Sequence, residues 1–300
     1  MTMKKYLLFL LAFVMSAFIL SCDNDSEPPT EKPIVESRMR LNESDSITMV
    51  NIYNAIGPWR EKWDFEDITT WNGVSVAYDL DTEQLRIVGL NVVVGNFDGQ
   101  LPDCIGDLSE LRVLVLAGGN LHGPIPESIG KLKHLNYLCL GDNNMYGEIP
   151  SSIGNLTELE WLRITNTKIS GRIPESIGNL TNLRYLMLYG NSLMGEIPKS
   201  LANLENLEGI WLNNNKLSGT FPIEILSRTN PKQINCKYNN IEHLPVEVWD
   251  DSDNRCPPDL QYNRIQTEIP QWVTQQKKWQ KGNYVLGNQQ DGYGYRLAED

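Results

Sequence analysis

The chain has few of the side chains on which most catalytic and metal sites depend. It contains three histidines and five cysteines in 300 residues. His122, His134 and His243 fall at three different phases of a 24-residue repeat, so no nucleophile–base–acid set can be assembled from them. No HExxH helix, phosphate-binding loop or paired-cysteine zinc spacing occurs. We therefore expect no catalytic residue, no metal, no cofactor and no enzymatic activity.

Basic residues are also scarce. The chain carries 26 lysines and arginines against 38 aspartates and glutamates, which gives a formal net charge of −12. A protein this acidic repels phosphate backbones and anionic polysaccharides. We therefore expect no nucleic-acid partner.

Only one long apolar run occurs, at residues 6–20, and it follows Lys4 and Lys5. Its length of about 15 residues is short of the roughly 20 that a membrane-spanning helix needs. The run indicates a signal peptide over residues 1–21. The end of the run, Ile-Leu-Ser-Cys, resembles the bacterial lipobox, which implies a lipoprotein whose lipidated first residue is Cys22. The alternative is an ordinary signal peptide followed by a chance cysteine.

Residues 22–43 are acidic, contain prolines and have low hydrophobicity, so they are expected to form a disordered tether. The acidic residues directly after Cys22 resemble the surface-export signals of some Gram-negative lipoproteins. This resemblance implies a membrane-anchored protein that is exposed on the surface of the bacterial outer membrane. A solvated linker has the same composition, so the periplasmic orientation stays open.

The rest of the chain is organised around a repeat of 24 residues, each unit reading LxxLxLxxNxLxGxIPxxIGxLxx, as in residues 135–158. The proline column consists of Pro102, Pro126, Pro150, Pro174, Pro198 and Pro222, each with a glycine three residues before it. The apolar pairs are Leu90/Val92, Leu114/Leu116, Leu138/Leu140, Leu162/Ile164, Leu186/Leu188 and Ile210/Leu212. A fixed period of this length indicates a solenoid.

This pattern resembles the 24-residue, plant-type leucine-rich repeat family. The resemblance implies an α/β solenoid: a right-handed superhelix with a parallel sheet on its concave face, and about eight coils over residues 87–270. The asparagine position should satisfy backbone groups where the coil turns away from the strand. It is filled by Asn143, Asn191, Asn215, Asn239 and Asn263, whereas Gly95, Gly119 and Thr167 depart from it. We therefore expect a weaker ladder near the N-terminus.

Caps should cover the two open ends of the solenoid. For the N-terminal cap, residues 44–86, the sequence predicts a helix over residues 44–57, with Ile47, Val50, Tyr53 and Ile56 at a step compatible with one helix face. Trp59, Trp63, Phe65 and Trp71 follow, and the tryptophans are expected to form cap core. This segment resembles the N-terminal cap of plant-type repeats, but the cysteines that such caps usually carry are missing. Residues 271–300 are expected to form the C-terminal cap, and a Cys236–Cys256 disulfide is left undecided.

Strand alternation places three columns of side chains on the outer, concave face of the sheet. Coils three to six concentrate aromatic and other large side chains there. The candidate ligand-binding residues are Tyr137, Trp161, Arg163, Tyr185, Met187, Tyr189, Trp211 and Asn213. Such residue types are enriched at interface cores, although aromatic residues also favour strands without any ligand.

We interpret the protein as a monomeric, non-enzymatic recognition module that binds a protein or peptide on the concave face. The alternative is carbohydrate binding by the same aromatic residues, because flat rings suit sugar faces. By strand alternation, Trp161 and Trp211 should be exposed to solvent, whereas Leu162 and Leu212 beside them should be core.

Overall fold

The structure is a computed structural model that describes residues 40–57, 63–93, 97–229, 231–244, 258–266, 268–269 and 296–297. The expected signal peptide, Cys22 and most of the tether lie outside these residues. So do Trp59, Cys256 and all but two residues of the expected C-terminal cap.

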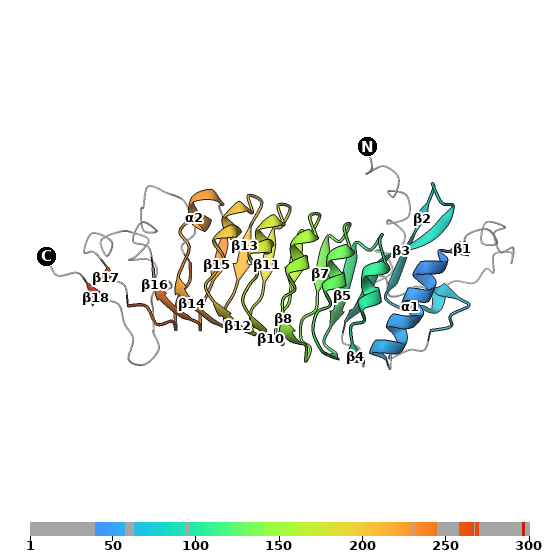
Figure 1. Ribbon diagram of the computed structural model, residues 1–300, viewed down its shortest axis with the longest axis horizontal. Helices are drawn as coiled ribbons and strands as arrows, with labels where there is room; N and C mark the ends of the chain where they lie inside the picture. Colours follow the sequence, from blue (N-terminus) through green and yellow to red (C-terminus); the bar gives the residue numbers. More distant parts are fainter. Residues whose placement is uncertain are drawn as a thin grey trace, which may run out of the picture.

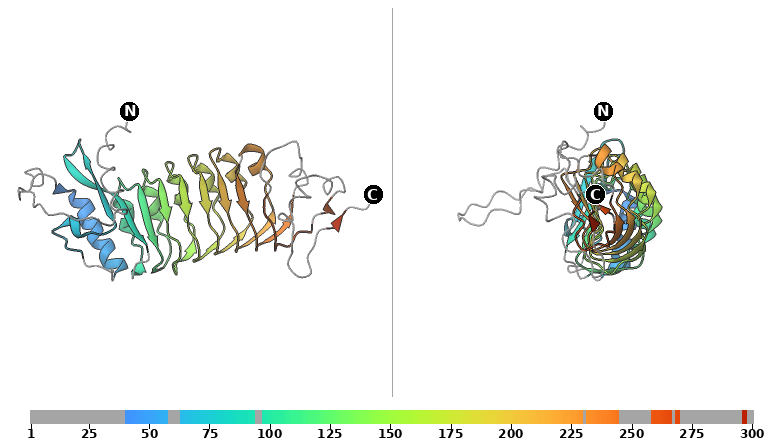
Figure 2. Two further views of the ribbon diagram at one scale, coloured as in Figure 1. Left: turned by 180° about the vertical axis from the view of Figure 1, so that it is seen from behind. Right: turned by 90° about the vertical axis from the view of Figure 1, so that its left-hand side faces the viewer.

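Parallel strands stack along an elongated solenoid, and a view along its axis superimposes the coils (Figures 1 and 2). The main sheet has nine strands, in the order β1-β3-β5-β7-β9-β11-β13-β15, with β2 pairing antiparallel to β3. Their bounds are β1 Arg40–Leu41, β2 Val74–Asp79, β3 Gln84–Val93, β5 Val113–Ala117, β7 Tyr137–Cys139, β9 Trp161–Arg163, β11 Tyr185–Met187, β13 Gly209–Trp211 and β15 Gln233–Asn235.

A second parallel sheet lines another side of the coils, in the order β16-β14-β12-β10-β8. Its strands are β8 Tyr146–Glu148, β10 Lys168–Gly171, β12 Ser192–Gly195, β14 Lys216–Thr220 and β16 Asn240–His243. Two short pairs complete the strands: β4 Asp98–Gln100 with β6 Asn120–His122, and β17 Glu268–Ile269 with β18 Arg296–Leu297.

Short 3-10 helices close each coil on the side away from the main sheet. They are η3 Asp103–Asp107, η4 Glu127–Lys131, η5 Ser151–Asn155, η6 Glu175–Asn179 and η7 Lys199–Asn203, and the helix α2 Glu224–Arg228 follows them. A further 3-10 helix, η2 Ile68–Thr70, lies in the N-terminal cap. A proline stands directly before each of the helices η3 to η7, with φ between −78° and −61°. Proline suits this position because its φ is fixed near −65° and no backbone donor is needed there.

The glycine of the IG dipeptide packs against the next coil. A Cβ added at Gly154 would lie 2.3 Å from the backbone oxygen of Ser176. Gly106, Gly130 and Gly178 meet the serine of their next coil in the same way. The repeated glycine therefore sets how closely neighbouring 3-10 helices stack.

The predicted apolar pairs form one continuous core. Leu162, Ile164 and their counterparts from Leu114 to Leu212 are buried, and only Val92 of the first pair is half-buried. Cys236 is a free, fully buried thiol in this core. The weaker seventh and eighth units keep the register, because Asn239, Ile241, Leu260 and Asn263 are all buried. The prediction of the repeat register is therefore confirmed across the described coils.

The N-terminal helix α1 spans Glu43–Ile56, which confirms the predicted helix, but of the four residues predicted to share one face only Ile56 is buried. Ile47 is 56% exposed, and the buried apolar residues are Met49, Ile52 and Ile56. The expected step of three drifts around a helix of 3.6 residues per turn, whereas the observed spacing follows one face. Trp63 and Trp71 are buried and stack with centroids 5.5 Å apart, as expected for cap core.

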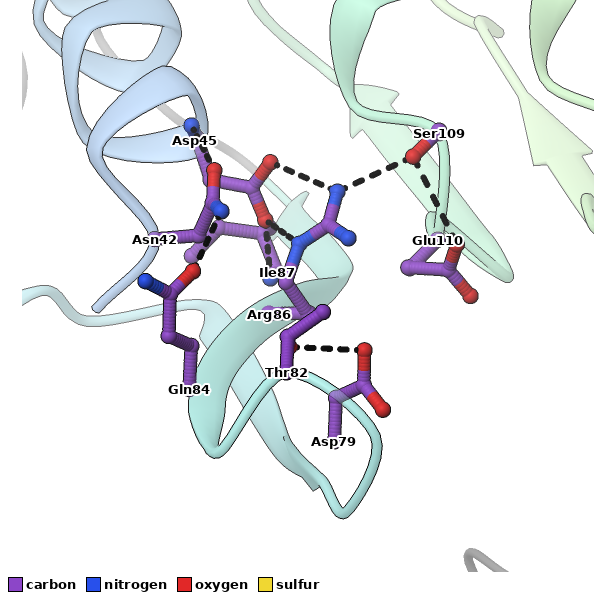
Figure 3. Close-up of polar contacts among 9 residues, drawn as sticks. All are labelled: Asn42, Asp45, Asp79, Thr82, Gln84, Arg86, Ile87, Ser109 and Glu110. Atoms are coloured by element: carbon purple, nitrogen blue, oxygen red, sulfur yellow. Dashed lines mark hydrogen bonds and ion pairs between the residues drawn. The ribbon is translucent and has the colours of Figure 1, made fainter. Parts of the chain in front are cut away.

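A buried carboxylate ties α1 to the sheet (Figure 3). Asp45 is fully buried, and both of its oxygens accept hydrogen bonds from the guanidinium of Arg86, at 2.9 and 3.1 Å. The backbone N–H of Ile87 donates to the same carboxylate at 2.9 Å. The hydrogen bonding of the Arg86 guanidinium to the Asp45 carboxylate raises the pKa of Arg86. A buried charge is tolerated only when it is paired and hydrogen-bonded in this manner, so strand β3 and helix α1 hold each other in place.

Asparagine side chains bridge consecutive coils at the turn out of each main-sheet strand. The Nδ2 of Asn215 donates to the carbonyls of Leu188 and Leu212 at 2.9 and 3.0 Å, and its Oδ1 accepts from the N–H of Leu193 at 3.0 Å. Corresponding bonds are made by Asn143, Asn191, Asn239 and Asn263. This confirms the expected role of the position, although Asn191 is half-buried rather than buried.

The coils without asparagine use other solutions. A Cβ added at Gly119 would lie 2.0 Å from the ring of Phe97, so this buried ring occupies the place of a side chain. In the coil of Thr167, the threonine hydroxyl instead accepts a hydrogen bond from the backbone N–H of Ile169, with an N···O distance of 3.2 Å.

Replacing Asn215 by leucine should destabilise the protein, because the buried N–H of Leu193 loses its acceptor. The carbonyls of Leu188 and Leu212 each lose one of two carboxamide donors. Each buried group left unsatisfied costs about 1–3 kcal/mol. Asn213 makes no such bridge by its side chain and is half-buried, so Asn213→Leu should leave stability nearly unchanged. Urea unfolding of the two variants measures the difference, and equal destabilisation would contradict the register.

Candidate ligand-binding face

The outward side of the main sheet, here called the sheet face, carries the predicted site residues in register. Tyr137 on β7 is paired with Trp161 on β9, which is paired with Tyr185 on β11 and then with Gly209 on β13. In the next column, Cys139, Arg163, Met187 and Trp211 are paired in the same order. The structure thus brings the predicted columns together.

Four aromatic rings form a continuous stack on this face, here called the aromatic ladder: Tyr137, Trp161, Tyr185 and Trp211. Successive centroids lie 5.8, 3.9 and 6.3 Å apart, with interplanar angles of 30°, 34° and 30°. Trp161 therefore has a neighbouring ring on both sides. Each contact of this kind contributes about 0.5–1.5 kcal/mol beyond the buried area.

The last ring of the ladder comes from a different column. Trp211 belongs by register to the column of Met187, yet its indole leans over Gly209, where an added Cβ would lie 2.4 Å from two ring atoms. Gly209 thus leaves the space that Trp211 fills. Strand alternation alone could not reveal this.

The expectation that Trp161 and Trp211 are freely exposed is wrong in degree: both are half-buried, because the rings cover one another. Several smaller residues expected to face solvent are buried outright. Thr165 is fully buried, and Val115, Ala117 and Cys139 form a second apolar cluster against Val113 and Tyr137. The apolar surface of the sheet face therefore extends from the ladder toward β5.

The remaining predicted site residues lie beside the ladder, and all are half-buried. Arg163 donates from Nε to the hydroxyl of Thr165 at 3.3 Å and lies 3.5 Å from the carboxylate of Asp142. Met187 separates Arg163 from Trp211 in their column. Tyr189 and Asn213 lie beyond the ends of β11 and β13, which end at Met187 and Trp211.

A row of alternating charges runs along one edge of the ladder. Glu208 accepts from Nε of Arg184 at 2.8 Å, from Nζ of Lys232 at 2.7 Å and from the hydroxyl of Tyr185 at 3.2 Å. The hydrogen bond from Lys232, followed in size by the one from Arg184, lowers the pKa of the Glu208 carboxyl to about 2. Arg184 also lies 3.8 Å from Glu160. This network orients Tyr185 within the stack.

Sequence reasoning missed this row, although a signal was present. Glu160, Arg184, Glu208 and Lys232 stand 24 residues apart and alternate in sign. Side chains at one phase of consecutive coils are neighbours in space, so such alternation predicts ion pairs.

A second stacked pair lies outside the predicted site. Tyr238 and Tyr262 stack with centroids 4.3 Å apart and an interplanar angle of 4°. Both have a left-handed backbone, with φ of 54° and 59°. The preceding coils fill this phase with Gly118, Asp142, Asn166, Gly190 and Asn214, also at positive φ.

Left-handed backbone costs a residue with a Cβ about 1–2 kcal/mol, and glycine, asparagine and aspartate tolerate it best. One stacked aromatic pair offsets only about 0.5–1.5 kcal/mol. The two tyrosines therefore strain the backbone more than their own contact compensates.

Comparisons with known proteins agree with this architecture. Residues 104–240 match a family model described as a leucine-rich repeat region. The fold is a leucine-rich repeat solenoid. A search of curated protein sequences found no match.

Several solved structures resemble the chain. A plant peptide hormone receptor, RGFR1 in complex with RGF2, is 31% identical with a TM-score of 0.54, and the match covers 69% of this chain and 31% of that chain. A plant ice-binding protein is 26% identical with a TM-score of 0.63, covering 77% and 74%. The ectodomain of the Arabidopsis receptor kinase HAESA, bound to an IDA peptide hormone, shares the fold at 24% identity and a TM-score of 0.63, covering 85% and 41%. This solenoid spans less than half of either receptor chain.

Among the residues that the structure describes, no helix is long and apolar enough to cross a membrane. In the same part of the chain, no group of three or more His, Cys, Asp or Glu side chains is arranged to hold a metal ion.

Gly209→Ala should displace the Trp211 indole from the ladder, because the new Cβ would overlap the ring. We expect a loss of about 1–3 kcal/mol of stability from this overpacking and a changed near-ultraviolet circular dichroism spectrum. Gly89→Ala is the matched control in the same column, because its Cβ would approach only Ser75, at 3.1 Å. An unchanged spectrum for Gly209→Ala would contradict the seating of Trp211.

Proposed function

We propose that the protein is a non-enzymatic, monomeric recognition module that binds a protein or peptide on the sheet face. The aromatic ladder is the observation that carries this proposal. Four large rings lie on four adjacent strands and are only half-buried, and half-buried Val113 adjoins them at the β5 side. Contiguous apolar and aromatic surface of this kind typically marks an interaction site.

The geometry of the rings favours a peptide over a sugar at this face. A sugar ring stacks on an open aromatic face, but Trp161 and Tyr185 each have a neighbouring ring on two sides. We expect rings that flank one another in this way to present mainly their edges to a ligand, and ring edges carry partial positive charge. Backbone carbonyl oxygens and the faces of other aromatic side chains match such edges, and a peptide supplies both.

The similar structures support a peptide partner. The RGFR1 structure contains RGF2, and the HAESA structure contains a peptide hormone. The similar ice-binding protein does not lead us to propose ice as the ligand here. An ice lattice would be matched by identical groups repeated on every coil, whereas one column here holds Val113, Tyr137, Trp161, Tyr185 and Gly209 in turn.

Trp161→Ala should weaken peptide binding strongly while reducing stability only moderately. Truncating an interface hot spot costs about 2 kcal/mol or more, roughly thirtyfold in affinity. Losing two ring contacts costs folding about 1–3 kcal/mol, whereas Leu162→Ala opens a core cavity at about 2–5 kcal/mol. The measurement is the Kd of a peptide selected by the wild-type chain from a displayed random library, together with urea unfolding.

Tyr146→Ala is the matched control, because Tyr146 is 51% exposed on the second sheet and should not affect the Kd. Failure of the wild-type chain to select any peptide would contradict the proposed function. Full-strength binding by Trp161→Ala would move the site away from the ladder.

We also propose that Cys22 carries a lipid that anchors the protein to the outer membrane, with the solenoid facing outward. The lipobox-like end of the signal segment supports the anchor, and the acidic residues after Cys22 support the surface location. An acidic tether would hold the solenoid away from a negatively charged membrane surface, leaving the sheet face accessible to a partner.

Cys22→Ala should abolish labelling by a fatty-acid analogue and release the protein into the soluble fraction. Protease added to intact cells should degrade the wild-type solenoid if it faces outward. An unlabelled wild-type protein would contradict lipidation, and protection from protease would assign the periplasmic orientation instead.

A further inference from the structure

The column of residues with positive φ, which begins at Gly118, ends in Tyr238 and Tyr262. The free-energy cost of their left-handed backbone is larger than the stabilisation from their stacking contact. The five preceding coils show that glycine, asparagine or aspartate fills this phase. Persistent local strain of this kind characterises functional sites. Tyr238 is also 47% exposed, which is a large fraction for an aromatic side chain.

The two faces of the Tyr238 ring have different neighbours. Tyr262 covers one face of Tyr238 at a 4.3 Å centroid distance. The other face lies on the side of the preceding coil, where the column holds only Asn214 and then Gly190. These coils are directly adjacent, because the N–H of Asn215 donates to the carbonyl of Tyr238 at 3.2 Å. Asparagine and glycine are shorter than tyrosine, and Tyr238 stays 47% exposed although Tyr262 covers one of its faces. The position bounded by Tyr238, Asn214 and Gly190 is here called the notch.

The surroundings of this notch are polar and nearly neutral. Asn214 is exposed, and its carboxamide has no hydrogen-bond partner among the described residues, whereas the carboxamide of Asn166 in the same column donates to Asp142. Lys237 is neutralised by Asp259 at 3.0 Å. An apolar peptide side chain would find a single ring here and little other apolar surface.

We propose that the notch at Tyr238 binds a pyranose ring of a neutral carbohydrate. The C–H face of the sugar stacks on the open face of Tyr238, and the carboxamide of Asn214 exchanges hydrogen bonds with the sugar hydroxyls. This site is separate from the aromatic ladder, whose inner rings each have a neighbouring ring on two sides. A glycan and a peptide thus occupy different parts of the same solenoid.

Tyr238→Asn gives a test in which stability and binding change in opposite directions. Asparagine is the residue that Asn166 and Asn214 provide at this phase, so the substitution relieves the strained backbone. The melting temperature should stay level or rise by about 2–4 °C. Binding of the full chain to an array of neutral pyranose oligosaccharides should fall at least about tenfold.

Tyr146→Ala controls for loss of an exposed tyrosine and should leave array binding unchanged. Peptide binding by Tyr238→Asn should also be unchanged, which separates this inference from the proposed function. A wild-type chain that retains no oligosaccharide, or a Tyr238→Asn variant that retains them at full strength, would overturn the inference. A lower melting temperature for Tyr238→Asn would show that the tyrosine serves the fold instead.

Discussion

The asparagine ladder is the interaction on which the solenoid depends. At each turn out of the main sheet, backbone carbonyls and N–H groups point into the interior where no strand can pair with them. One carboxamide satisfies groups of its own coil and of the preceding coil at once. Burying these groups without partners would cost more than a leucine in the same place could contribute. The leucine core supplies most of the burial, but the carboxamides make a turn within that core possible.

The periodicity of the sequence accounts for most of what could be predicted. A 24-residue step places residues of one phase side by side, and strand alternation then separates Leu162 from Trp161. Burial at the weaker seventh and eighth units followed the same rule. The helix α1 shows where the rule weakens. A step of three predicted the helix but does not define its buried face, because Ile47 is exposed and Met49 is buried.

The parts that could not be predicted all involve side chains that reach beyond their own position. Trp211 fills the space above Gly209, and Phe97 fills the space beside Gly119. Thr165 and Cys139 are buried because curvature and neighbouring side chains cover them, although alternation points them outward. Asp45 pairs with Arg86, which lies 41 residues later in the sequence, and the repeat does not relate these two positions. The left-handed backbone of Tyr238 and Tyr262 is inconspicuous in the sequence, because tyrosine is a poor indicator of that conformation.

The one-ring-per-coil construction of the ladder makes the length of the recognition surface a discrete variable. Each coil contacts chiefly its neighbours and adds one strand spacing of about 4.8 Å. Duplicating or deleting a whole 24-residue unit therefore lengthens or shortens the surface by one rung while the core register is kept. Outward residues can then diversify independently of the inward residues that close the coil. In such a protein, changes in partner size are recorded as insertions of complete units, and changes in partner identity as substitutions confined to single phases.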